Sequence, residues 1–181
     1  MPKSTLNRTP GGQYEIRIEG RFAHPHWVSF LFSGLSQQQI SIVSGRALQD
    51  ARLEWDARFV LDFRFSTAVP QNLDYVALAE KNPPQNDTGM PRLSHFEIKG
   101  HLRGMEVLIS GPDQVGFLGR LMRKLSLLAL FPVEIDINTV SGVINDRIVL
   151  QTIGGGAVSE TVRAALQALL RDLIAQGELA R

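Results

Sequence analysis

The segment Glu106–Leu130 reads EVLISGPDQVGFLGRLMRKLSLLAL and places a strand, a tight turn and a helix in direct succession. Val107 and Ile109 alternate with the residues around them, a pattern typical of a strand with a buried face. After the turn at Gly111–Asp113, apolar residues recur at helical spacing. They are Leu118, Leu121, Met122, Leu125 and Leu128. The segment is therefore predicted to form a strand–turn–helix unit.

This strand–turn–helix order occurs twice along the chain, although the two halves share little residue identity. In the first half, periodicity predicts strands at residues 14–22, 40–43, 51–64 and 95–99, and helices at residues 24–35 and 71–81. In the second half, it predicts strands at residues 105–110, 133–138 and 143–152, and helices at residues 114–130 and 158–176. Each half thus reads strand–helix–strand–strand–helix, and the first half adds a final strand.

Two further patterns refine this layout. Apolar and charged side chains alternate almost strictly from residue 51 to residue 64, with Val60 as the exception. We place the hairpin that precedes this strand at residues 45–50. The pair Ser141-Gly142 is a tight hairpin signal, and residues 82–91 (NPPQNDTGMP) are predicted to form a loop because they are rich in turn residues.

The element order favours an α+β fold made of two ferredoxin-like βαββαβ modules, with antiparallel sheets and helices on one face. We expect a disordered leader at residues 1–12, a first module at residues 13–101 and a second at residues 102–181. Because open sheets leave free edges, the two sheets could join side by side, and a homodimer could extend them. Only residues 177–181 follow the last helix, so either residues 95–99 or a partner chain could complete the second sheet.

The composition of the 181 residues is that of an ordinary globular protein, with 44% hydrophobic and 20% charged residues. The net charge of +1 comes from 19 basic and 18 acidic residues that are interspersed, which argues against a nucleic-acid partner. The absence of cysteine excludes disulfides, thiol nucleophiles and zinc held by cysteine. No apolar run approaches the roughly 20 residues of a membrane span, and the first residues lack an apolar signal core. We therefore expect a cytoplasmic protein with no membrane partner.

The octapeptide GPDQVGFL at Gly111–Leu118 resembles the turn between the first strand and first helix of ACT domains, where the usual pattern is Gly-x-Asp-x-x-Gly-hydrophobic-Leu. The resemblance covers about residues 105–175. It implies a ferredoxin-like module that binds an amino acid or related small ligand between paired modules and regulates an attached or partner enzyme. The first half departs from the pattern, because Gly20–Trp27 lacks the Asp and the second Gly.

Ligand-binding residues follow from this resemblance and from the free N–H groups that a helix N-terminus offers to a carboxylate. Asp113 either orients the ligand's ammonium group or simply caps the helix, a role worth about 1 kcal/mol. Gly116 allows either ligand approach or close helix packing, and Asn138 either reaches the ligand or lies on a wet strand face. The candidate residues are Gly111, Asp113, Gln114, Val115, Gly116 and Asn138.

Other candidate motifs carry less chemistry. His24-Pro25-His26 is the one tight histidine pair and could ligate a metal, but capping or packing explains it as well. Gly154–Gly156 lacks the Lys-Ser/Thr of a phosphate-binding loop and indicates a hinge or a loop. We therefore predict no catalytic residue, no metal and no cofactor.

The sequence thus favours a non-catalytic regulatory protein that binds a small ligand, an amino acid by preference, and modulates a partner enzyme allosterically. A homodimer or higher homo-oligomer is expected. The alternative is a structural interaction module that oligomerises without a ligand. A third possibility, an enzyme whose catalytic residues are dispersed along the sequence, has no motif in its favour.

Overall fold

The computed structural model describes residues 1–84 and 89–179, with the side chains described up to residue 176. The predicted loop at residues 82–91 therefore lies partly outside the described residues. The helices and strands are β1 Lys3–Arg8, β2 Tyr14–Gly20, α1 Trp27–Gln37, β3 Ser41–Gln49, β4 Trp55–Asp62, α2 Tyr75–Glu80, β5 His95–His101, β6 Gly104–Pro112, α3 Phe117–Leu127, β7 Leu130–Val140, β8 Val143–Thr152 and α4 Glu160–Leu179. A short 3₁₀ turn at Pro70–Asn72 precedes α2.

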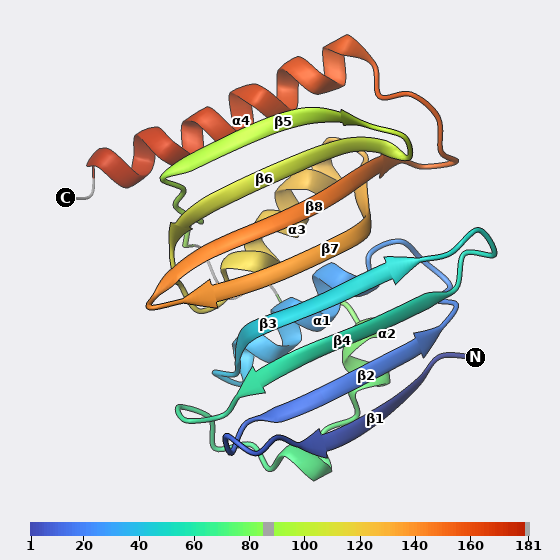
Figure 1. Ribbon diagram of the computed structural model, residues 1–181, viewed down its shortest axis with the longest axis vertical. Coiled ribbons are helices and arrows are strands. Elements are labelled where there is room, and N and C mark those ends of the chain that lie inside the picture. The colour runs from blue at the N-terminus through green and yellow to red at the C-terminus, as the bar shows by residue number, and fades with distance from the viewer. Residues whose placement is uncertain (85–88, 180–181) are drawn as a thin grey trace.

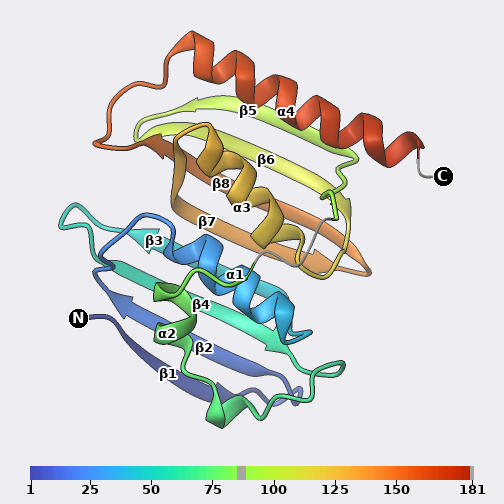
Figure 2. The same cartoon turned by 180° about the vertical axis from the view of Figure 1, so that it is seen from behind.

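The strands of the described residues form one eight-stranded antiparallel sheet in the order β1-β2-β4-β3-β7-β8-β6-β5 (Figure 1). The first four in this order belong to one module and the last four to the other, and β3 and β7 join them. The helices α1, α2, α3 and α4 of the described residues lie on the same side of the sheet (Figure 2). The protein is therefore an α+β fold of two ferredoxin-like modules, as the sequence predicts, and the two sheets have joined side by side.

The outer strand of each module comes before its helices in the chain, and this corrects two sequence-based expectations. Residues 1–12 are not a disordered leader, because β1 pairs with β2 from Lys3↔Glu19 to Arg8↔Tyr14. The strand at residues 95–101 does not belong to the first module, because β5 pairs with β6 throughout its length. The module boundary therefore lies before residue 95 rather than at residue 101. Strand β5 is the fourth strand of the second module's sheet, which is therefore complete within this chain.

The hairpin between β3 and β4 lies later than predicted. Strand β3 continues to Gln49, and the turn occupies residues 50–54, where the Asp50 carboxylate accepts hydrogen bonds from the N–H groups of Arg52 and Glu54 at 2.8 and 2.9 Å. Leu53 has a positive φ of 63° there. The alternation of residues 51–54 is thus a turn that happens to continue the strand pattern. By contrast, Ser141 and Gly142 have φ values of 51° and 75°, the left-handed pair that a tight type I′ hairpin requires.

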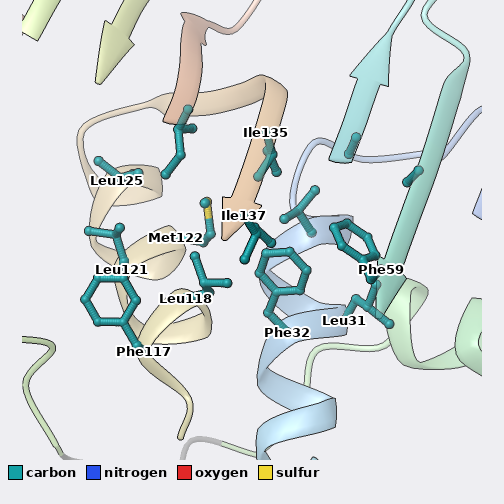
Figure 3. Packing of buried hydrophobic residues seen from close by; sticks show 14 of the residues in the cluster. Leu31, Phe32, Phe59, Phe117, Leu118, Leu121, Met122, Leu125, Ile135 and Ile137 are labelled. Carbon is teal, nitrogen blue, oxygen red and sulfur yellow. The ribbon is translucent and has the colours of Figure 1, made fainter. Parts of the chain in front are cut away.

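A single hydrophobic core fills the space between the sheet and its helices and extends through both modules. Figure 3 shows how it passes the junction, where Leu118 and Met122 of α3 face Ile137 of β7 and Phe32 of α1. Phe32 packs edge-on against Phe59 of β4, with ring centroids 5.2 Å apart. Because both modules contribute to this one core, neither buries its apolar surface alone.

The opposite face of the sheet carries charged side chains in ion pairs. Arg147 lies in the middle of an acidic group, with its guanidinium 2.6 Å from the carboxylates of Glu106 and Glu134 and 3.0 Å from that of Asp136. Hydrogen bonds to these carboxylates raise the pKa of Arg147 despite its partial burial. Arg46 of β3 reaches Asp136 of β7 at 3.4 Å, across the module junction. This mixed-sign face matches the wet face that the alternation predicts.

None of the helices in the described part of the chain is long and apolar enough to span a bilayer.

Candidate functional site

The pairing of β3 with β7 determines where the loops of each module lie. The two strands run antiparallel around the pair Arg46↔Asp136, so an approximate two-fold axis relates the modules. The loop before α3 therefore lies beside the start of β3, and the loop before α1 lies beside the start of β7. The loop before the first helix of each module thus meets the other module.

A pocket lies where the loop before α3 meets the first module. Residues 113–119 form one wall, and Phe32 and Ser36 of α1 together with residues 40–42 form another. The floor is Ile137, Thr139, Ile144 and Asp146 of the second module's sheet. The volume of the pocket that water-sized groups can occupy is about 30 Å³, which is room for about two such groups. The pocket as it stands admits one small polar group, such as an ammonium, and leaves the rest of a ligand at its mouth.

Four of the predicted ligand-binding residues line this pocket, namely Asp113, Gln114, Val115 and Gly116. Two do not. A Cβ at Gly111 would lie 2.8 Å from the carbonyl oxygen of Arg92, so this glycine allows the backbone of residues 92–94 to pack closely. Asn138 is exposed and takes part only through its backbone N–H.

The carboxyl group of Asp146 is the most distinctive chemical group in the pocket. Asp146 is 3% exposed, and one oxygen, Oδ1, accepts the backbone N–H of Asn138 at 3.0 Å. The other oxygen, Oδ2, has no hydrogen-bond partner among the described residues. A buried carboxylate oxygen without a partner lowers the stability of the fold. A cationic or hydrogen-bonding group inside the pocket would remove this penalty.

The surroundings of Asp146 also shift its ionisation. Burial, which disfavours the charged form, raises the pKa of Asp146 from 3.8 to about 7, against the opposing effect of the Asn138 hydrogen bond. The negative charge of Asp113 raises it further. The pocket therefore contains two carboxyl groups close enough to repel each other, and Arg, Lys and His are absent from its lining. A cationic group entering the pocket would relieve this repulsion.

The local start of α3 differs from the expected cap. The residue at the helix N-cap is Gly116 with φ 78°, and Asp113 lies three positions earlier, with its N–H donating to the carbonyl oxygen of Gly142 at 2.8 Å. Asp113 is therefore not the N-cap. Because α3 has no side-chain cap and no acidic residue in its first turn, its N-terminus favours a nearby anionic group.

Asp146 is the residue that sequence reasoning missed, although the sequence contains a signal for it. Ile144 and Ile148 stand two positions before and after Asp146 in β8 and are both buried. A strand places such residues on one face, so the alternation puts a lone carboxyl among core side chains. A charged residue in a buried register is an unusual feature that points to function.

The histidine pair before α1 packs on aromatic rings. His26 stacks with Phe30, with ring centroids 5.7 Å apart, and meets Phe131 of β7 edge-on at 5.0 Å. Burial, followed by the neighbouring His24, lowers the pKa of His26. Within the described residues, no three His, Cys, Asp or Glu side chains gather in a group that could hold a metal. The packing explains why these rings lie between the modules.

Comparisons with known proteins give a likeness to solved structures alone. No protein-family model and no curated protein matches the chain. The solved structure described as "Crystal Structure of Aspartate Kinase from Synechocystis" is similar, with 15% sequence identity and a TM-score of 0.47. The match covers 89% of this chain and 26% of that chain, so this chain spans about a quarter of that kinase chain's length.

Proposed function

We propose that this protein is a non-catalytic regulatory module that binds a small ligand with a cationic group, an amino acid in the simplest case, at the boundary of its two modules. The observation that supports this proposal is the buried Asp146 carboxyl group in the pocket behind the Asp113–Gly116 loop, whose Oδ2 has no hydrogen-bond partner among the residues that the structure describes. A ligand ammonium would supply the missing partner in a charge-assisted hydrogen bond.

The same site suits the other end of an amino acid. The carboxylate would lie at the uncapped N-terminus of α3, beside Gly116. The side chain would remain at the mouth of the pocket, because the inner space of about 30 Å³ admits only a small group. The ligand's ammonium and carboxylate thus determine that it is an amino acid, while the residues at the mouth of the pocket discriminate among amino-acid side chains.

Regulation follows from the position of the pocket. Phe32 and Ser36 come from the first module and Asp113 and Asp146 from the second, so a bound ligand would favour one packing of the modules over others. Only a difference in affinity between two packings can transmit a signal to a partner. We propose a partner enzyme as the receiver of this signal and a homodimer or higher homo-oligomer as the assembly.

The second candidate function is a structural interaction module that needs no ligand. It is favoured by the free outer edge of β1, which pairs only with β2 in the described structure and offers a row of backbone groups to another chain. In this case Asp146 would remain unpaired and no small molecule would stabilise the fold.

Thermal unfolding of the full chain in the presence of each of the twenty amino acids separates the two functions. At about 100 times its dissociation constant, a ligand adds about 2.7 kcal/mol to the free energy of unfolding, which we expect for one class of amino acid. The Asp146→Asn variant should fold and bind this ligand at least about tenfold more weakly, so the same ligand concentration should stabilise it less. Asp172→Asn, on the exposed face of α4, should retain the full stabilisation. If no amino acid shifts the transition, the ligand-free module is the better description.

A further inference from the structure

The counterpart of the first pocket, at the other end of the β3–β7 junction, is a larger cavity. Its walls are the loop before α1 at residues 21–25, the start of β7 at residues 131–133, and the end of β8 with the chain that follows it at residues 151–155. Its volume is about 420 Å³, within the roughly 300–1,000 Å³ that small-molecule sites in proteins occupy. The approximate two-fold axis therefore creates a second cavity of ligand size.

The two cavities are opposite in charge. The first has Asp113 and Asp146 in its lining and no basic side chain. The second contains Arg21 and His24 and no Asp or Glu among its lining residues. Arg21 is exposed and forms no ion pair within the part of the chain that the structure describes. A free guanidinium beside a cavity without acids attracts a carboxylate, which it can bind through two parallel hydrogen bonds.

Part of the second cavity's lining is aromatic, beside the polar residues Gln49, Gln151 and Thr152. Trp55 and Phe131 line it and are only 6% and 8% exposed. Phe22, another lining residue, stacks on Trp27 at 4.4 Å with the rings almost parallel. Trp27 in turn meets Trp55 edge-on at 5.0 Å. This packed set of rings is a rigid wall on which a planar ring can lie in offset or edge-on contact.

We infer that this second cavity binds a small aromatic carboxylate, with its ring against Trp55 and Phe131 and its carboxylate toward Arg21. The site is distinct from the Asp146 pocket in position and in charge, so the protein has two non-equivalent ligand sites. A compound with only an ammonium would enter the first, and a compound with only a carboxylate would enter the second.

The tryptophans provide a local readout of binding. The chain has two tryptophans, Trp27 and Trp55. Trp55 lines the second cavity, and Trp27 packs directly against it. Titration of the full chain with phenylacetate, under excitation that selects tryptophan, should give a saturable change in emission. Phenethylamine, which has the same ring and the opposite charge, should bind at least about tenfold more weakly, since one charge-assisted hydrogen bond accounts for such a factor. Acetate, which lacks the ring, should also bind at least about tenfold more weakly, because it does not bury the apolar surface of the ring.

Variants of Arg21 test the charge assignment. Arg21→Gln should weaken phenylacetate binding about tenfold or more, and Arg21→Lys should restore part of it. Arg58→Gln, an exposed residue on the opposite face of the sheet, is the matched control and should have no effect. Asp146→Asn should also leave phenylacetate binding unchanged, so failure of the amino-acid site and failure of this site are distinguishable.

Three outcomes would overturn the inference. The first is the absence of any saturable emission change up to millimolar phenylacetate. The second is equal binding of phenylacetate and phenethylamine, and the third is equal binding by the chain and its Arg21→Gln variant. Because Arg21 is exposed, its substitution leaves the core intact, and a loss of binding by Arg21→Gln with an unchanged unfolding transition would support the site.

Discussion

At the scale of single residues, Asp146 combines a cost to stability with a chemical opportunity. Its side chain lies on the buried face of β8, and within the described part of the chain only one of its oxygens has a hydrogen-bond partner. The flanking positions on the same face of β8 are Ile144 and Ile148, so an apolar residue in place of Asp146 would pack without this penalty. A binding role explains why a carboxyl group is useful at this position, because a ligand cation can complete the hydrogen bonding that the protein leaves unfinished.

The first prediction concerns the pH dependence that Asp146 confers. Its pKa of about 7 in the folded protein lies above the ordinary 3.8, so the folded state binds the proton more tightly than the unfolded state. The free energy of unfolding should therefore fall as pH rises from about 4 to about 7, by at most about 4 kcal/mol. Asp146→Asn lacks this titration, so its stability relative to the unmodified chain should increase over that range.

Urea unfolding of both proteins at several pH values between about 5 and 8 measures this difference. The amide that replaces the carboxyl adds a cost that is the same at every pH, so the slope of the difference against pH isolates the ionisation of Asp146. A constant difference between the two proteins across this range would show that Asp146 is not the group responsible.

At the scale of elements, the contact between α1 and α3 depends on small residues. A Cβ at Gly119 would lie 2.7 Å from Ser33 Oγ and 3.0 Å from the Ser33 backbone nitrogen, so the two helices approach too closely for any side chain at that position. The two helices belong to different modules, and their approach closes the first pocket between the loop before α3 and the end of α1.

The second prediction tests this close approach. Gly119→Ala should destabilise the fold by about 1–3 kcal/mol, because an added methyl group would force the helices apart in a packed core. Gly100→Ala in β5 is the matched control, since a Cβ there has open space around it. Chemical denaturation of the two variants gives the comparison. If Gly119→Ala lowered the free energy of unfolding no more than Gly100→Ala does, the close approach of the two helices would not be required for stability.

At the scale of the whole molecule, the two modules share one sheet and one core. Strands β3 and β7 pair along five residue positions from Ser44↔Asn138 to Leu48↔Glu134, and Phe32 and Ile137 meet below this seam (Figure 3). Separation of the modules would expose both the strand edges and this apolar surface. The chain should consequently behave as a single cooperative unit despite its internal repeat.

The third prediction follows from this sharing. Calorimetry should show one unfolding transition whose calorimetric and van't Hoff enthalpies agree. Two buried residues test this, Leu61 in the first module and Ile148 in the second. Substitution of either by Ala should lower the free energy of unfolding by about 2–5 kcal/mol and so lower the midpoint of that same transition. Two separate transitions, each responding to only one of the substitutions, would contradict it.

Local physics explains which features the sequence determined by itself. The helix of α3, the alternating strands and the Ser141-Gly142 turn depend on periodicity and on φ preferences of neighbouring residues, so they are visible in the chain. The fold class and the position of the Asp113–Gly116 loop follow from the order of these elements. Four candidate site residues therefore lie together as a consequence of one contiguous segment.

Tertiary structure alone decided the pairing partners and the composition of the pockets. The apolar alternation of residues 95–101 would be the same whichever module's sheet this strand joined. Strand β1 pairs with the edge of β2, a partner that its own sequence does not specify. Asp146 reaches the first pocket through the pairing of β8 with β6 and β7. The pairing of β3 with β7 brings residues 40–42 to the first pocket and places Arg21 and Phe131 together in the second. Such contacts join residues far apart in the chain, and no local periodicity records them, since they depend on which sheet edges meet.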